Sequence, residues 1–109
     1  MIEDYQGVEW VSSDLLKGRD ASVLVVTGDS MIGDNIYERD KVVVVMQHEV
    51  TSSDIAVVAV NEEAATLKRI KRQGDLCILM PSNPHIEPIV VDAKDVRVIG
   101  KIIEVRQGR

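Results

Sequence analysis

Ser30 is the first residue whose setting could support chemistry. It follows the apolar run Val23–Val26 and lies in the segment Thr27-Gly28-Asp29-Ser30-Met31-Ile32-Gly33. Glycines on both sides allow the backbone to turn sharply and to present the serine hydroxyl. Taken alone, this pattern is more typical of a serine in an ordinary turn than of a nucleophile.

Lys68 is the second such residue, in the segment Ala64–Arg72. In a strand, Thr66, Lys68 and Ile70 share one face, while Leu67, Arg69 and Lys71 share the other. Lys68 would then lie beside Ile70 against apolar surroundings, and Arg69 and Lys71 would reach water. Burial disfavours the ammonium form, and a lysine whose pKa falls to ~7–8 can accept a serine proton near neutral pH. By itself, the segment also fits a solvated basic strand or a phosphate-binding patch.

The elements that would position these residues have the apolar pattern of β-strands. Runs rich in β-branched residues are separated by turn-forming residues such as Gln73-Gly74-Asp75. Only Ser12–Leu16 is expected to form a helical turn. The sequence predicts a compact all-β fold of sandwich or partial-barrel type, with at most one short helical turn, in a single domain over residues 1–109. The expected strands are Val23–Val26, Val42–Met46, Ile55–Val60, Leu76–Met80, Ile89–Val91 and Val96–Val105.

The last of these strands is apolar on both faces. Val96, Val98 and Ile102 have one parity, and Ile99, Ile103 and Val105 have the other. Strict alternation would leave one face polar. Burial of both faces, by a second subunit or within one core, would explain the pattern, and an exposed apolar edge strand would also invite pairing.

Composition limits the possible functions. The net charge of −5 is opposite to that of a free-standing DNA-binding domain. Cys77 is the only cysteine, so no intrachain disulfide is expected, and we interpret it as a small buried apolar residue. No group of residues has metal-ligand spacing, so neither a metal nor a cofactor is expected. The longest apolar runs are too short to span a bilayer, which favours a cytoplasmic protein.

The two segments together resemble the catalytic core of the LexA family of self-cleaving proteins, which includes LexA repressors, phage repressors and UmuD. Gly28-Asp29-Ser30-Met31 is followed by Thr66-Leu67-Lys68-Arg69, with Lys68 standing 38 positions after Ser30. Arg39 stands where the family usually has glycine. The similarity covers residues 8–106 in the expected order and includes Asn35–Val44, Ser53–Val60, Pro81–Pro84 and Ile99–Ile103.

This resemblance implies a serine peptidase in which Ser30 is the nucleophile and Lys68 is the base. Gly28, Asp29 and Met31 would be the neighbours that form the substrate pocket or the oxyanion site. The resemblance also implies a homodimer, a RecA–DNA filament that activates cleavage, and DNA contact only through an N-terminal domain absent from this chain. The implied dimer interface contains Ile99, Lys101, Ile103 and Val105.

The family cleaves itself at an Ala-Gly or Cys-Gly bond well upstream of the serine, and neither dipeptide occurs in this chain. We therefore expect a C-terminal fragment that carries the catalytic groups without their substrate. Two alternatives remain open: a UmuD-like accessory subunit of a translesion DNA polymerase, and a dormant dimerisation module. An upstream helix-turn-helix would favour the repressor, and a short N-terminal arm would favour the accessory subunit.

Overall fold

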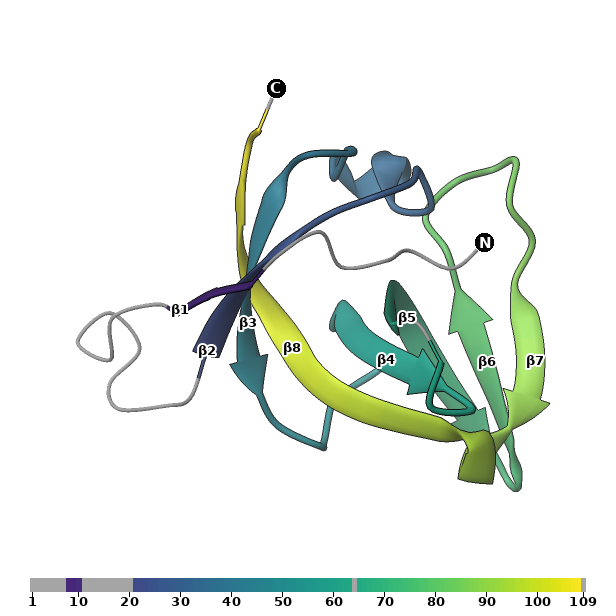
Figure 1. The fold of residues 1–109 in the computed structure, drawn as a ribbon. Helices are drawn as coiled ribbons and strands as arrows, with labels where there is room; N and C mark the ends of the chain where they lie inside the picture. Colours follow the sequence, from purple (N-terminus) through teal and green to yellow (C-terminus); the bar gives the residue numbers. More distant parts are fainter. Residues whose placement is uncertain (1–7, 11–20, 64, 109) are drawn as a thin grey trace.

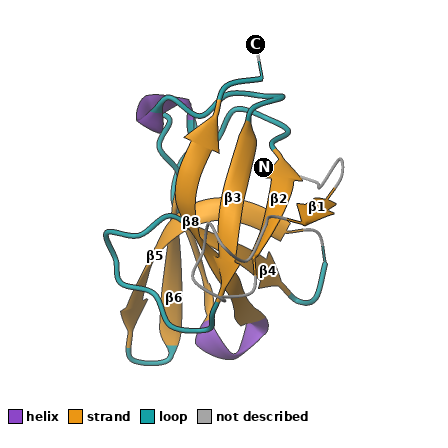
Figure 2. Ribbon diagram, turned by 90° about the vertical axis from the view of Figure 1, so that its left-hand side faces the viewer, coloured by secondary structure: helices purple, strands orange, loops and turns teal. Residues whose placement is uncertain are grey.

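The computed structural model describes residues 8–10, 21–63 and 65–108, and these form strands joined by turns. Two short 3-10 turns, η1 (Ile32–Asp34) and η2 (Ala93–Asp95), lie at opposite ends of the molecule (Figure 2). The all-β prediction is confirmed, with two helical turns where at most one was expected; Ser12–Leu16 lies outside the described residues. The strands are β1 (Val8–Trp10), β2 (Ala21–Val25), β3 (Lys41–Met46), β4 (Ala56–Val60), β5 (Ala65–Gln73), β6 (Leu76–Met80), β7 (Ile89–Asp92) and β8 (Val96–Arg106).

The strands follow the hydrogen-bonded order β1-β2-β3-β8-β4-β5-β6-β7, and neighbouring strands are antiparallel. The long β8 joins the two halves, since β4 pairs with its Val96–Lys101 part and β3 with its Gly100–Arg106 part. Register shifts occur at Val43/Val44 and at Val57/Val58. Such irregularities bend a sheet, and Figure 1 shows the sheet curving about β8.

This order bears on the two explanations considered for the apolar faces of β8, a second subunit or a single core. β8 lies in the interior of the sheet, and part of its apolar character is explained by its own core. Val98 is buried, and Ile99 and Ile102 pack against a core cluster, but Ile103 is 43% exposed and Val105 is 39% exposed. The chain's own core therefore explains the apolar residues up to Ile102, whereas Ile103 and Val105 present exposed apolar surface.

The core is aliphatic and forms two main clusters, as expected for alternating strands with side chains buried on both faces. Val57 and Val58, adjacent in β4, are fully buried and belong to different clusters. The first cluster contains Leu24, Val26, Met31, Ile36, Val42, Val44, Val57, Ala65 and Leu67, and the second contains Ala56, Val58, Ile70, Cys77, Leu79 and Val98. No helix among the residues that the structure describes is long and apolar enough to cross a membrane.

A buried carboxylate, Asp40, holds the loop that leads into β3. Its Oδ2 accepts the main-chain N–H of Tyr37 at 2.9 Å, and its Oδ1 accepts that of Gly108, also at 2.9 Å. Hydrogen bonds to the ionised form compensate for the loss of hydration of a buried carboxylate. Asp40 thus links the chain after η1 to the residues that follow β8.

Candidate active site

Ser30 lies in a tight turn that follows β2 and includes η1, which we call the Ser30 turn (residues 28–34). The turn begins at Gly28, whose φ of +83° is accessible to glycine at little cost, and it is followed by Asn35 in the left-handed region at φ +62°. Within the turn, the N–H of Asp34 donates to the carbonyl oxygen of Met31 at 3.0 Å. Ser30 and Met31 are buried, and Asp29 is exposed.

Lys68 lies on β5 with its side chain directed at this turn. Its Nζ is 3.0 Å from the Oγ of Ser30, a hydrogen bond between residues far apart in sequence. Nζ also forms a short hydrogen bond with the Oγ1 of Thr66, which shares its face of the strand. The serine is 0% exposed and the lysine 2%, so water is largely excluded from both groups.

The rest of β5 partly follows the expected alternation. Ile70 is buried on the face of Lys68, and Lys71 reaches water. On the other face, Leu67 is buried in the first core cluster, and Arg69, which was expected to reach water, is only half-exposed. Both faces of β5 are covered near the lysine, whereas the strand end at Lys71–Gln73 is solvated.

Arg69 lies half-buried because it forms an ion pair with Asp34 of the Ser30 turn. Two guanidinium nitrogens contact the two carboxylate oxygens, with Nη2 and Oδ1 3.0 Å apart. The hydrogen bond from Arg69 lowers the pKa of Asp34; partial burial opposes this effect, and a hydrogen bond from Ser82 adds to it. The ion pair therefore attaches the end of the Ser30 turn to the residue that follows Lys68.

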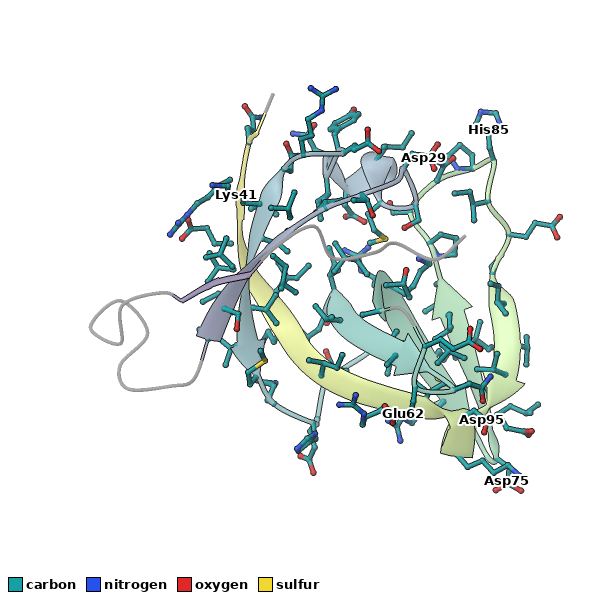
Figure 3. The ribbon with its side chains drawn as sticks, in the orientation of Figure 1. Asp29, Lys41, Glu62, Asp75, His85 and Asp95 are labelled. Carbon is teal, nitrogen blue, oxygen red and sulfur yellow. The ribbon has the colours of Figure 1, made fainter. Side chains whose placement is uncertain are left out.

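A second segment, Pro81–Pro84 between β6 and β7, also contacts the Ser30 turn. The N–H of Ser82 donates to the carbonyl oxygen of Ser30 at 2.7 Å, and the N–H of Gly33 donates to that of Ser82 at 2.6 Å. The Nδ2 of Asn83 donates to the carbonyl oxygen of Asp29 at 2.8 Å. Figure 3 shows Asp29 and His85 at the same end of the molecule, where these two loops lie side by side.

The sequence pattern indicated Ser30 and Lys68 as a pair, but it did not indicate Thr66, Asn83 or the Arg69–Asp34 ion pair as their partners. Thr66 could have been predicted as a partner of Lys68, because a residue two positions earlier in a strand lies on the same face. The Asn83 contact depends on how loops from distant parts of the chain pack, and local spacing carries no signal of it.

The residues expected at a dimer interface differ in their surroundings. Ile99 packs against the chain's own core, and the Nζ of Lys101 lies 3.4 Å from the Oδ1 of Asp54. Ile103 and Val105 are exposed. Only the last two therefore present apolar surface to a partner.

Several residues lie outside this site. His48 and His85 are exposed. Cys77 is buried, as interpreted from the sequence. Burial raises the pKa of the Cys77 thiol, which disfavours the reactive thiolate. Among the described residues, no group of three His, Cys, Asp or Glu side chains could hold a metal ion.

An all-β domain with a serine hydroxyl hydrogen-bonded to a buried lysine amine has an arrangement that fits a serine peptidase. The comparison with known proteins agrees with this class: the profile of the Peptidase S24-like family matches residues 1–103, and the chain belongs to this family of serine peptidases.

Curated relatives of the chain carry the name LexA repressor. The protein from Geotalea uraniireducens is 44% identical over 103 residues, which cover 93% of this chain and 51% of the relative. The protein from Caldicellulosiruptor saccharolyticus is 37% identical over 102 residues, covering 94% of this chain and 49% of the relative. The chain thus spans about half the length of these relatives and resembles one part of a LexA repressor.

Proposed function

We propose that this chain is the autopeptidase and dimerisation part of a LexA-like transcriptional repressor, with Ser30 as nucleophile and Lys68 as general base. The observation that carries the proposal is the buried hydrogen bond of 3.0 Å between Ser30 Oγ and Lys68 Nζ. A base must lie within hydrogen-bond reach of the proton that it accepts, and this pair meets the condition.

Burial is what makes the lysine a useful base. An ammonium group loses hydration when it is buried, so its neutral form is favoured and its pKa falls. The hydroxyl groups of Ser30 and Thr66 can hydrogen-bond the amine in either protonation state, since a hydroxyl both donates and accepts. Thr66 would therefore hold the amine in place while its charge changes.

The proposed reaction is acyl transfer in two stages. Ser30 Oγ attacks the scissile carbonyl carbon as its proton passes to Nζ of Lys68. The C–N bond then breaks, the leaving amine takes the proton from Nζ, and an ester to Ser30 remains. Water then attacks the ester carbonyl carbon as Lys68 accepts one of its protons, the bond from that carbon to Ser30 Oγ breaks, and the proton returns from Nζ to Ser30 Oγ. Main-chain N–H groups beside Ser30, in the region of Gly28, Asp29 and Met31, would stabilise the oxyanion by about 3 kcal/mol per donor.

The remaining parts of the proposal come from the relatives named LexA repressor. The substrate would be an upstream linker of the same protein, cleaved when a RecA–DNA filament signals DNA damage. Contact with DNA would belong to an N-terminal domain, in keeping with the net charge of −5 here. The exposed Ile103 and Val105 would contribute to a homodimer. The shared name favours a repressor over a UmuD-like polymerase subunit.

The experiment supplies the substrate, either fused upstream of the chain or as a separate peptide that contains Ala-Gly. Cleavage should become faster as the pH rises, because more Lys68 becomes neutral. Ser30→Ala and Lys68→Ala should each abolish cleavage while the circular dichroism spectrum is retained. Lys71→Ala removes an exposed lysine of the same strand and is the matched control, with cleavage at the parental rate. Cleavage by either dyad variant at the parental rate would refute the assignment.

A further inference from the structure

The segment Pro81–Pro84 contacts the main chain on both sides of Ser30. The carbonyl oxygen of Asp29 accepts a hydrogen bond from Asn83 Nδ2 at 2.8 Å, and that of Ser30 accepts one from the N–H of Ser82 at 2.7 Å. Asn83 is 7% exposed, so the bond that its side chain makes is largely shielded from water. The Pro81–Pro84 segment lies so close to Gly33 that a side chain would not fit there. A Cβ at Gly33 would be 2.5 Å from Ser82 Oγ and 2.7 Å from Ser82 O.

These bonds fix the orientation of two peptide groups. A peptide bond is planar and trans, so its C=O and N–H point to opposite sides of the chain. Asn83 holds the Asp29 carbonyl, so it also fixes the direction of the Ser30 N–H, which belongs to the same peptide group. Ser82 fixes the Met31 N–H in the same way. Both N–H groups then point away from the Pro81–Pro84 segment.

We propose that Asn83 is a positioning residue for the nucleophile: its side-chain N–H groups orient the Asp29–Ser30 peptide so that the main chain beside Ser30 can stabilise the oxyanion. This inference rests on the proposed peptidase function and extends it to a residue outside the dyad. Donors that are oriented before the reaction stabilise developing charge without the cost of reorganisation. Asn83 does not touch the substrate and acts through the peptide that it holds.

The two ends of the Asn83 side chain have separable roles. Its Oδ1 accepts the N–H of His85 at 2.9 Å, and its own carbonyl oxygen accepts the N–H of Ile86 at 3.0 Å. This is the local capping that asparagine commonly provides in turns. Only the Nδ2 end reaches the Ser30 turn. Asn83→Asp keeps the shape of the side chain and the acceptor for His85 but removes the donor to Asp29, and Asn83→Ala removes both.

The test measures the rate at which an alkyl fluorophosphonate modifies Ser30 in the chain as it is, between pH 6 and pH 10. In this reaction the Oγ–P bond forms, the P–F bond breaks, fluoride leaves and the serine proton passes to Lys68. Charge develops on the phosphoryl oxygen, so the rate depends on the oriented N–H groups. Asn83→Asp and Asn83→Ala should both react about 10- to 100-fold more slowly than the parent. The pH midpoint of the rate should remain that of the parent, because it belongs to Lys68.

Glu87→Ala changes an exposed residue of the same loop and should react at the parental rate. Thermal unfolding checks that each variant is folded, and Asn83→Ala serves if the aspartate variant is not. Folded Asn83 variants that react within about twofold of the parent would overturn the inference, as would a shifted pH midpoint, which would place the effect on Lys68. A parent that does not react, or a Lys68→Ala variant that reacts equally fast, would instead contradict the proposed peptidase function and with it this inference.

Discussion

Burial of an amine carries a desolvation penalty, and for Lys68 this penalty is largest for the charged ammonium form. At 2% exposure, either form of the amine loses most of its hydration. Two hydroxyl partners compensate a neutral amine for this loss far better than they compensate an ammonium ion. The same burial would favour the neutral base that the proposed mechanism requires beside Ser30.

Arg39 carries backbone strain. Its φ of +76° lies in the left-handed region, where an L-residue with a Cβ is strained by about 1 kcal/mol. We predict that Arg39→Gly raises the free energy of unfolding by about 0.5–1 kcal/mol, since the relief of strain exceeds the added entropy of the unfolded chain. Chemical denaturation measures the change. Arg72→Gly, at an exposed strand position of β5, should instead destabilise the protein; a loss of stability in Arg39→Gly would show that this arginine makes a contact that outweighs its strain.

At the residue scale, local chemistry and spacing alone left Ser30 and Lys68 ambiguous, because a glycine-flanked serine is more often a turn residue and the Lys68 segment also fits a solvated basic strand. The resemblance to the LexA family paired them, and the structure places their side chains 3.0 Å apart. Asn83 could not be predicted, because an asparagine in a Pro-rich turn usually caps its own loop. Its contact with Asp29 exists only because β5, β6 and the Ser30 turn pack together.

At the scale of elements, the Ser30 turn is attached to β5 by more than the dyad. The Asp34–Arg69 ion pair joins η1 to β5 with two charge-assisted hydrogen bonds, and Arg69 Nε also lies 3.3 Å from the carbonyl oxygen of Ser53. A bidentate arginine–carboxylate pair restricts both partners in direction as well as distance. The relative position of turn and strand therefore has a support that is independent of Ser30 and Lys68.

The contribution of this ion pair should depend on pH. Arg69 lowers the pKa of Asp34 below the ordinary value of 3.8, so the stabilisation is present above pH 3.8 and is lost as the pH falls through the folded-state pKa. Asp34→Asn should lower the free energy of unfolding by about 1 kcal/mol at pH 7, a modest value because both side chains are partly exposed. Denaturation at several pH values should show the difference from the parent shrinking below pH 3.8.

The matched control is Asp92→Asn, at an exposed position of β7. It should change stability by no more than about 0.5 kcal/mol. A deficit in Asp34→Asn that stays constant, or grows, under acid conditions would show that Asp34 stabilises the turn by some means other than its charge.

The strands themselves were largely readable from the sequence, because β-branched runs and turn residues are local signals. Their order was not: β8 is last in the chain and yet pairs with β3 and β4 in the middle of the sheet. Long-range pairing of this kind leaves no periodic mark on the sequence. The short 3-10 turns, η1 and η2, escaped prediction because three residues are too few to establish a helical period.

At the scale of the whole molecule, the proposed dimer depends on the part of β8 that the core does not cover. Ile103 is 43% exposed, so Ile103→Asp should leave the monomer folded. If a second subunit covers this surface, the substitution buries an unpaired charge at the interface, and the dimer should dissociate at least about tenfold more readily. Sedimentation velocity over a range of concentrations measures the effect.

Leu76→Asp provides the comparison, since Leu76 is 45% exposed on β6, away from the C-terminal end of β8. It should leave the dimer intact. A parent chain that remains monomeric at high micromolar concentration would contradict the proposed dimer, and a dimer weakened only by Leu76→Asp would move the interface to β6 and β7.

The proposed mechanism requires Lys68 to be a neutral base at its position beside Ser30. The most direct test is an NMR titration of the Lys68 side chain in the intact chain, with Ser30→Ala as a comparison. We predict that Lys68 titrates well below the value of about 10.4 for a free lysine, because burial disfavours its ammonium form. A Lys68 that titrates at the free-lysine value of about 10.4 would contradict the proposed mechanism, because the amine would then be charged at neutral pH and unable to take the proton of Ser30.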